Sequence, residues 1–128
     1  MWRALAQYVG GTGSRRLTRQ IARALRCSPG ERRGTMPEIG STVPGFIVTR
    51  SVPPAVLALM GEHRFSRYAL IFRITETLAG PVRLSAETRA DFPGGRGRAY
   101  RALVIGTRGH VLAVHSMLRS VRRAAEQA

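Results

Sequence analysis

Lysine is absent from the sequence, cysteine occurs once, and no apolar stretch is long enough to cross a bilayer. The single cysteine, Cys27, excludes an intrachain disulfide and makes a reducing compartment the simplest expectation. The N-terminus has neither the apolar stretch nor the cleavage site of a secretory signal, and a spanning helix needs about 18 consecutive apolar residues. The sequence therefore predicts a cytoplasmic protein without a transmembrane segment.

Acidic residues are also scarce: seven stand against 21 arginines, which gives a formal net charge of +14. Clustered cationic side chains neutralise phosphates and release counterions, so this balance invites a nucleic-acid interpretation. Arginine, alanine, glycine and valine are plentiful together, however, which is the amino-acid usage of a GC-rich genome. Composition then explains much of the charge, and the basic surface is open to nucleic acid, anionic lipid, an acidic partner or plain solvation.

The length of 128 residues and the apolar content of 44% are those of one globular domain, residues 1–128, with room for a single core. Residues 1–9 have helical character, and a glycine-rich break separates them from a second helical run. In that run Leu17, Ile21 and Leu25 recur every four residues and form one apolar face. The first part of the chain is therefore expected to be two short helices.

The period of the apolar residues changes to two after an irregular connection at 28–45, which is rich in proline, glycine and serine. The alternation predicts strands at 46–52, 56–64, 68–75 and 82–92, of which the last alternates most cleanly. Short connections favour hairpins, because a parallel crossover needs a dozen or more residues. The expected sheet is an antiparallel meander.

From about Gly97 the period returns to helical and predicts one long amphipathic helix, about 40 Å in length, docked on the sheet. Its apolar stripe comprises Tyr100, Leu103, Thr107, Val111, Val114, Leu118, Val121 and Ala125. Gly106 and Gly109 each cost about 1 kcal/mol in a helix interior, and they predict a kink or a close approach by the sheet or a ligand. The fold class is therefore α+β: an antiparallel β-meander against a long C-terminal α-helix, with two short N-terminal helices.

Few residues form a recognisable reactive constellation. Gly10, Gly11 and Gly13 resemble a phosphate loop only superficially, because they follow a helix rather than a strand. His110 and His115 stand about 140° apart around a helix, and no cysteine or acidic cluster completes a metal site. Neither a metal nor another cofactor is expected, and no catalytic residue is assigned.

The densest polar cluster runs from Glu62 through His63 to Tyr68, where one predicted strand ends and the next begins. At a pocket mouth, a carboxylate, an imidazole and a phenol can orient a polar ligand or transfer a proton. The alternative is a charged hairpin turn. His110, beside the apolar stripe, either points into a cavity between helix and sheet or is a satisfied boundary histidine.

The proline-started strand 52–61, the closing strand with Thr88 and Phe92, and the helix from Tyr100 together resemble a known fold. It is the helix-grip fold of the START-like, or SRPBCC, superfamily, which includes polyketide cyclase/dehydrase-like proteins and lipid-binding cups. The resemblance covers most of residues 44–126 and implies a curved sheet wrapped around the long helix. The family usually begins with a strand before the first helix. This sequence starts at the helix, so either the natural start lies upstream or the sheet lacks an edge strand. An uncovered edge would favour pairing of two copies or poor solubility.

That fold implies a cavity between sheet and helix for an apolar ligand. The implied walls are Leu57, Leu59, Tyr68, Leu70, Phe72, Leu84, Ala86, Thr88, Tyr100, Val104, Val111 and Val114, each equally well explained as ordinary core. His63 and His110 join them as polar candidates. The expected partner is a hydrophobic or aromatic small molecule or a lipid.

Three functions remain open at this point. The first is binding of such a ligand without catalysis. The second is a START-like enzyme of the cyclase or dehydrase kind, with the polar cluster or His110 handling protons. The third is a nucleic-acid or acidic-partner module that uses the arginine-rich helices at 15–33 and 96–123.

Overall fold

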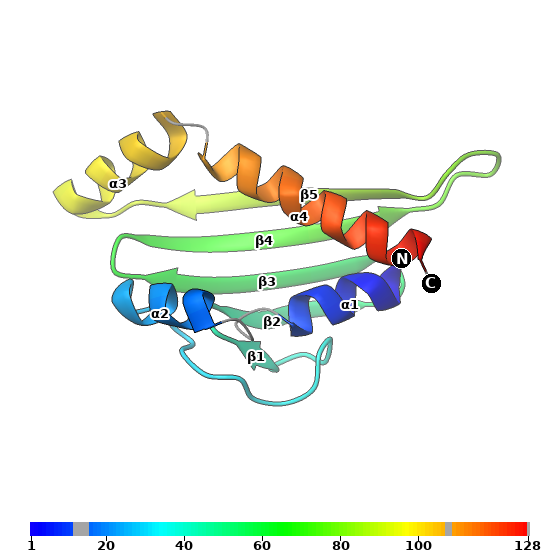
Figure 1. Ribbon diagram of the computed structural model, residues 1–128, viewed down its shortest axis with the longest axis horizontal. Coiled ribbons are helices and arrows are strands. Elements are labelled where there is room, and N and C mark those ends of the chain that lie inside the picture. Colours follow the sequence, from blue (N-terminus) through cyan, green and yellow to red (C-terminus); the bar gives the residue numbers. More distant parts are fainter. Residues whose placement is uncertain (12–15, 107–108, 128) are drawn as a thin grey trace.

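An open antiparallel sheet with helices along one face makes up the computed structural model (Figure 1). The structure describes residues 1–11, 16–106 and 109–127, apart from the side chains at positions 18, 104–106, 109 and 110. In chain order the elements are α1 (Trp2–Gly10), α2 (Arg16–Ala24), β1 (Thr42–Val43), β2 (Phe46–Val52), β3 (Val56–His63), β4 (Ser66–Thr75), β5 (Arg83–Asp91), α3 (Gly94–Gly106) and α4 (Gly109–Glu126).

The described strands lie side by side in chain order, and each pairs antiparallel with the next, so the predicted meander is confirmed. β1 is a short addition inside the segment expected to be irregular, and it pairs with the start of β2. β1 and β5 form the two edges of the sheet. Pairing of two copies at an edge stays a prediction.

Alternate side chains of β4 and β5 point to opposite faces of the sheet, as the period of two predicts. Leu70 pairs with Leu59 on β3 and with Thr88 on β5, while Phe72 pairs with Leu57 on one side. Because residues opposite one another across antiparallel strands share a face, these side chains form one continuous apolar surface. This inner face is the one that the helices cover.

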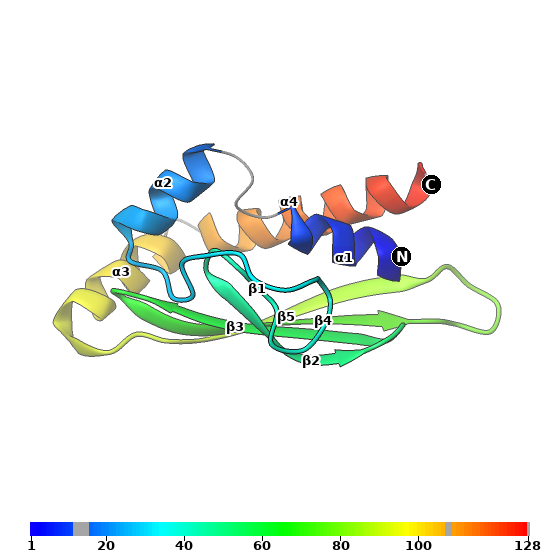
Figure 2. The same ribbon diagram turned by 90° about the horizontal axis from the view of Figure 1, so that it is seen from below.

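The helices α1 to α4 all lie on that face in the view of Figure 2, whereas no described helix covers the other face. α1 packs against α4, and both lie over the end of the sheet where β4 finishes. Leu5 of α1 and Val121 of α4 are fully buried there with Leu57 and Phe72 of the sheet. Sheet and helices therefore share one core, and the α+β class is confirmed.

The C-terminal segment corrects the prediction of one continuous helix. α3 ends at Gly106 and α4 begins at Gly109, and the two run in different directions (Figure 1). The break shifts the helical phase, so the predicted apolar stripe does not continue across it: Leu103 and Val111 are 64% and 50% exposed. Glycine is a poor residue for a helix interior, which explains why the break falls here. Thr107 of the stripe lies outside the described residues.

The apolar face predicted for α2 does not contact the core. Leu17 and Ile21 are 67% and 51% exposed, and Leu25 is half-buried. Backbone bonds hold the segment after the helix instead: the Ser28 amide donates to the Glu62 carbonyl at 2.7 Å, and the Glu62 amide donates back at 3.0 Å. α2 is therefore attached to the sheet through its C-terminal end rather than through an apolar face.

Candidate functional site

A pocket of about 630 Å³ lies between the inner face of the sheet and the helices α3 and α4. It occupies the end of the sheet opposite the α1–α4 core, and we call it the aromatic pocket. Rings and small side chains from β4, β5 and both helices form most of its wall. The lining residues are Phe46, His63, Ser66, Tyr68, Ala69, Leu70, Thr88, Ala90, Asp91, Phe92, Arg98, Tyr100, Arg101, Ala113, Val114 and Met117.

Tyr68 is fixed at the floor of the aromatic pocket by a close backbone approach. Its hydroxyl donates to the carbonyl oxygen of Gly45 at 2.7 Å. Gly61 lies directly opposite Tyr68 on β3, and a Cβ there would overlap the Gly45 carbonyl oxygen. Only glycine lets the three backbone segments and the ring come this close.

Burial raises the pKa of Tyr68 well above its usual range, with further contributions from neighbours of which Cys27 is the largest. The phenol therefore stays protonated and remains a donor at neutral pH. The Cys27 thiol interacts with the same hydroxyl, and burial raises the pKa of that thiol too. Tyr68, Cys27 and Gly45 thus form one closed polar contact in the wall.

His63 lies between two aromatic rings at the end of β3. Its ring centroid is 5.0 Å from that of Tyr100, edge-on, and 5.6 Å from that of Tyr68. The Phe65 amide donates to His63 Nδ1 at 3.1 Å, so the neutral imidazole carries its proton on Nε2. Burial lowers the pKa of His63, which favours this neutral form. His63 is therefore a neutral donor in the pocket wall at neutral pH.

Tyr100 attaches α3 to the sheet. Its ring stacks on Phe65 with centroids 5.3 Å apart and lies 6.2 Å from Phe92. Gly97, one turn earlier, is buried, and a Cβ there would come within 2.8 Å of the backbone of Phe92 and within 3.1 Å of that of Phe65. The missing side chain at Gly97 allows α3 to approach closely enough for Tyr100 to stack.

The polar cluster predicted around residues 62–68 is divided between the two faces of the sheet. Glu62 pairs with Arg67, their charged atoms 3.6 Å apart, and both side chains are mostly exposed. Neither residue lines the aromatic pocket, whereas His63 and Tyr68 do. Neighbours on a strand point to opposite faces, which places the Glu62 carboxylate away from the imidazole.

Charged side chains gather at one side of the aromatic pocket. Arg98 and Arg101 come from α3, three residues apart, and Asp91 ends β5. All three are exposed. Residues three apart on a helix share a face, so both guanidinium groups are available to a ligand that enters beside α3.

The predicted ligand-binding residues separate into four groups. His63, Tyr68, Leu70, Thr88, Tyr100 and Val114 line the aromatic pocket. Leu57, Leu59 and Phe72 are core residues, and Leu84 and Ala86 pack against that core. Val111 is half exposed on α4. The side chains of Val104 and His110 lie outside the described residues.

Several lining residues were not among the predicted ones: Phe46, Ser66, Ala69, Ala90, Asp91, Phe92, Arg98, Arg101, Ala113 and Met117. Phe92 and Ala90 continue the inner face of Thr88, and Met117 is one turn after Val114, so a stricter use of the two periods would have found them. The arginines carry no such signal, because they lie outside the predicted apolar stripe and a charged side chain on a helix is ordinarily expected to face solvent.

Comparison of the chain with models of protein families, with curated proteins and with solved structures finds no match. None of the described helices combines the length and the apolar character that crossing a membrane requires. Over the described residues, histidine, cysteine and carboxylate side chains do not gather in groups of three or more that could hold a metal ion.

Proposed function

We propose that this protein binds an apolar or aromatic small molecule, or the chain of a lipid, in the aromatic pocket. The observation that carries the proposal is a volume of about 630 Å³ bounded by five rings, those of Phe46, His63, Tyr68, Phe92 and Tyr100. Small-molecule sites typically measure about 300–1,000 Å³ and combine apolar walls with a few polar groups.

The rings that line the aromatic pocket already contact one another. The His63 ring lies edge-on to the ring of Tyr100, and the Phe46 ring lies edge-on to that of Tyr68 with centroids 5.4 Å apart. Aromatic pairs at such separations are worth about 0.5–1.5 kcal/mol beyond the burial of their area. A flat ligand would extend this arrangement, and the neutral Nε2–H of His63 would give it one directional hydrogen bond.

The antiparallel meander, its single covered face and the helical C-terminus support a START-like (SRPBCC) helix-grip fold of the polyketide cyclase-like kind. Two features depart from that pattern. The C-terminal helix is divided at Gly106 and Gly109, and the sheet stays open at β1 and β5. The division lets α3 and α4 run in different directions, and both helices contribute lining residues to the aromatic pocket (Figure 1).

Binding without catalysis is the form of the proposal that the geometry favours. The Tyr68 hydroxyl is already donated to Gly45, and Glu62 faces away from His63. Among the described residues that line the pocket, Asp91 is the one that carries a carboxylate, and it is exposed. Neither Tyr68 nor Glu62 is therefore placed to act with the His63 imidazole as an acid–base pair.

The test compares two substitutions on α4 that add the same ring at different positions. Val114→Phe fills the aromatic pocket, whereas Leu112→Phe adds a ring at a position that is 65% exposed and does not line it. Calorimetric titrations use 1-naphthol, 1-naphthoate and dodecanoate as probes. We expect the wild type to bind at least one probe, Val114→Phe to weaken it about tenfold or more, and Leu112→Phe to leave it unchanged.

Thermal unfolding of both variants is recorded in parallel, so that loss of binding is separated from loss of the fold. Two results would overturn the proposal. One is the absence of binding tighter than about 1 mM for all three probes. The other is equal binding in a folded Val114→Phe variant and in the wild type.

A further inference from the structure

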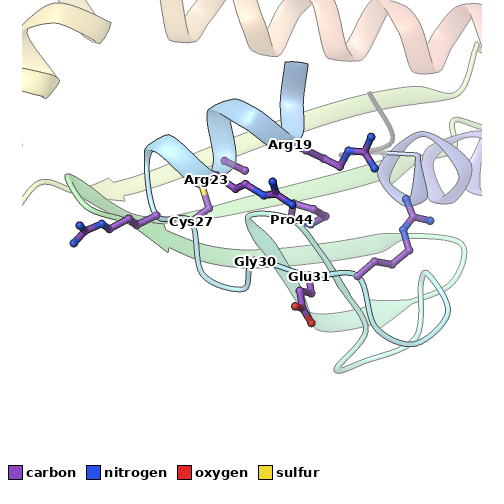
Figure 3. Close-up of a pocket in the computed structure, with 9 residues that line it drawn as sticks. Arg19, Arg23, Cys27, Gly30, Glu31 and Pro44 are labelled. Carbon is purple, nitrogen blue, oxygen red and sulfur yellow. The ribbon is translucent and has the colours of Figure 1, made fainter. Parts of the chain in front are cut away.

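A second pocket, of about 560 Å³, lies between α2 and the segment that follows it (Figure 3). Four arginines, Arg19, Arg23, Arg26 and Arg32, line it together with Glu31 and Pro44. We call it the basic pocket. Among the residues that the structure describes, none lines both this pocket and the aromatic pocket.

Two arginines of the basic pocket extend to the same side of α2, and the lining carboxylate does not join them. Arg19 and Arg23 are four residues apart on α2 and therefore share a helix face. In Figure 3 both extend on the Pro44 side of the helix, while the Glu31 carboxylate points away from them. Glu31 is paired with Arg33, their charged atoms 3.7 Å apart. In the described part of the chain, neither Arg19 nor Arg23 forms an ion pair with a carboxylate.

The walls of the basic pocket are held by backbone hydrogen bonds rather than by the arginines. The Gly45 amide donates to the Pro29 carbonyl at 2.7 Å, which ties the segment around Pro44 to the one after α2. The Arg64 amide donates to the Leu25 carbonyl at 2.9 Å, which ties the end of α2 to the β3–β4 hairpin. The site therefore needs no ligand to keep its shape, and a ligand meets walls that are already in place.

The positive charge of the basic pocket favours the binding of an anion. Guanidinium groups repel one another when they line one pocket, and α2 has no acidic residue that would compensate them. Arginine binds phosphate through two parallel hydrogen bonds, and several such groups around one space match the oxygens of a phosphate better than those of a single carboxylate.

We propose that the basic pocket binds the phosphate or diphosphate group of a small molecule, with Arg19 and Arg23 as its principal ligands. The limited volume of about 560 Å³ favours a small ligand over nucleic acid, which needs an extended basic surface that follows its backbone. This site is separate from the proposed apolar site, and neither proposal depends on the other.

The test uses pyrophosphate and inorganic phosphate as probes at constant ionic strength, with calorimetry and amide chemical shifts as readouts. Arg19→Gln and Arg23→Gln each remove one charge from the pocket. Arg16→Gln removes one charge from an exposed position of the same helix that does not line the pocket, so it is the matched control. We expect each pocket variant to bind pyrophosphate about tenfold more weakly and the control to bind within about twofold of the wild type.

Shifts of amides in α2 and around Pro44 are expected on titration, and Val114→Phe should leave them unchanged. Equal losses in Arg16→Gln and Arg23→Gln would mean that only the general ion atmosphere attracts the probe, which overturns the proposal. So would the absence of binding at about 1 mM pyrophosphate. A short DNA duplex that binds more tightly than pyrophosphate, and weakens equally with all three substitutions, would replace the small ligand with an extended nucleic-acid surface.

Discussion

The two ends of the covered sheet face have the same alternation of side chains and different outcomes. At one end Leu57 and Phe72 meet Leu5 of α1 and Val121 of α4, and every one of these side chains is fully buried. At the other end Tyr68 and its neighbours meet α3 and the beginning of α4, and a pocket remains. The inward pattern of a strand thus decides which face is covered but not whether the cover is complete.

The two ends of the sheet differ because the helices place different side chains over them. α1 and the second half of α4 supply Leu5, Val9, Leu118 and Val121, which pack with side chains of the sheet in one hydrophobic core. Over the other end α4 supplies Ala113 and Val114, which are small, and α3 contacts the sheet through the stacking of Tyr100 on Phe65. Binding capacity therefore comes with the poorly filled end, and stability with the filled one.

The largest effect is expected from damage to the filled end. Phe72→Ala removes a fully buried ring and should lower the free energy of unfolding by about 4 kcal/mol, because the lost transfer energy and the cavity add. Met60→Ala, on the uncovered face and 50% exposed, is the control and should cost about 1 kcal/mol or less. Chemical unfolding measures both. Similar losses of unfolding free energy in the two variants would mean that the filled end of the sheet is not the one that stabilises the fold.

An intermediate effect is expected where α3 attaches to the sheet. Gly97→Ala places a Cβ against the backbone of Phe92 and Phe65, and should cost about 1–3 kcal/mol while displacing Tyr100. Gly95→Ala, in the same helix, meets nothing within 4 Å and should be neutral or stabilising by up to about 1 kcal/mol. Chemical unfolding gives the cost, and ring shifts of Tyr100 in NMR spectra report the displacement. Unchanged Tyr100 shifts in Gly97→Ala would contradict this account of the attachment.

The smallest effect is expected from the titration of His63. Its pKa is lowered from 6.5 by burial, so the folded state favours the neutral ring. The resulting stability is present above pH 6.5 and is lost as the pH falls from there through the lower folded pKa. We expect an NMR titration midpoint below 6.5 and a shallower acid decline of the unfolding temperature in His63→Gln. A midpoint at or above 6.5 would show that the ring is solvated rather than enclosed.

Sequence patterns predicted the sheet well because alternation is local. The faces of β4 and β5, the hairpin connections and the covered side follow from neighbours along the strand. The same patterns could not distinguish Leu57 from Tyr68, since both side chains point inward. The distance to the covering helix decides that Leu57 is a core residue and that Tyr68 is part of the pocket wall. That distance depends on where α3 and α4 divide and on Gly97, whose role becomes apparent only when Phe65 and Phe92 are beside it.

Another wrong prediction concerns a helix face that the periodicity predicts to be buried. Leu17 and Ile21 form a regular apolar face, yet α2 is attached through backbone bonds near Ser28. The split between Glu62 and His63, in contrast, was available from strand alternation, because adjacent residues of a strand point to opposite faces. Local spacing therefore assigns a residue to a face, while contacts distant in sequence decide what covers it.

The contact of Tyr68 with Gly45 and Cys27 has a thermodynamic consequence for the whole molecule. Tyr68 lines the aromatic pocket, Cys27 lines the basic pocket, and Gly45 follows Pro44 in the basic pocket's wall. The two pockets are thus separated by a partition that both of them touch. If a ligand in one pocket displaced the Tyr68 ring enough to change the affinity of the other pocket, linkage would require the second ligand to change the affinity for the first by the same factor. Cooperativity between an apolar and an anionic ligand would then follow from a single tyrosine hydroxyl.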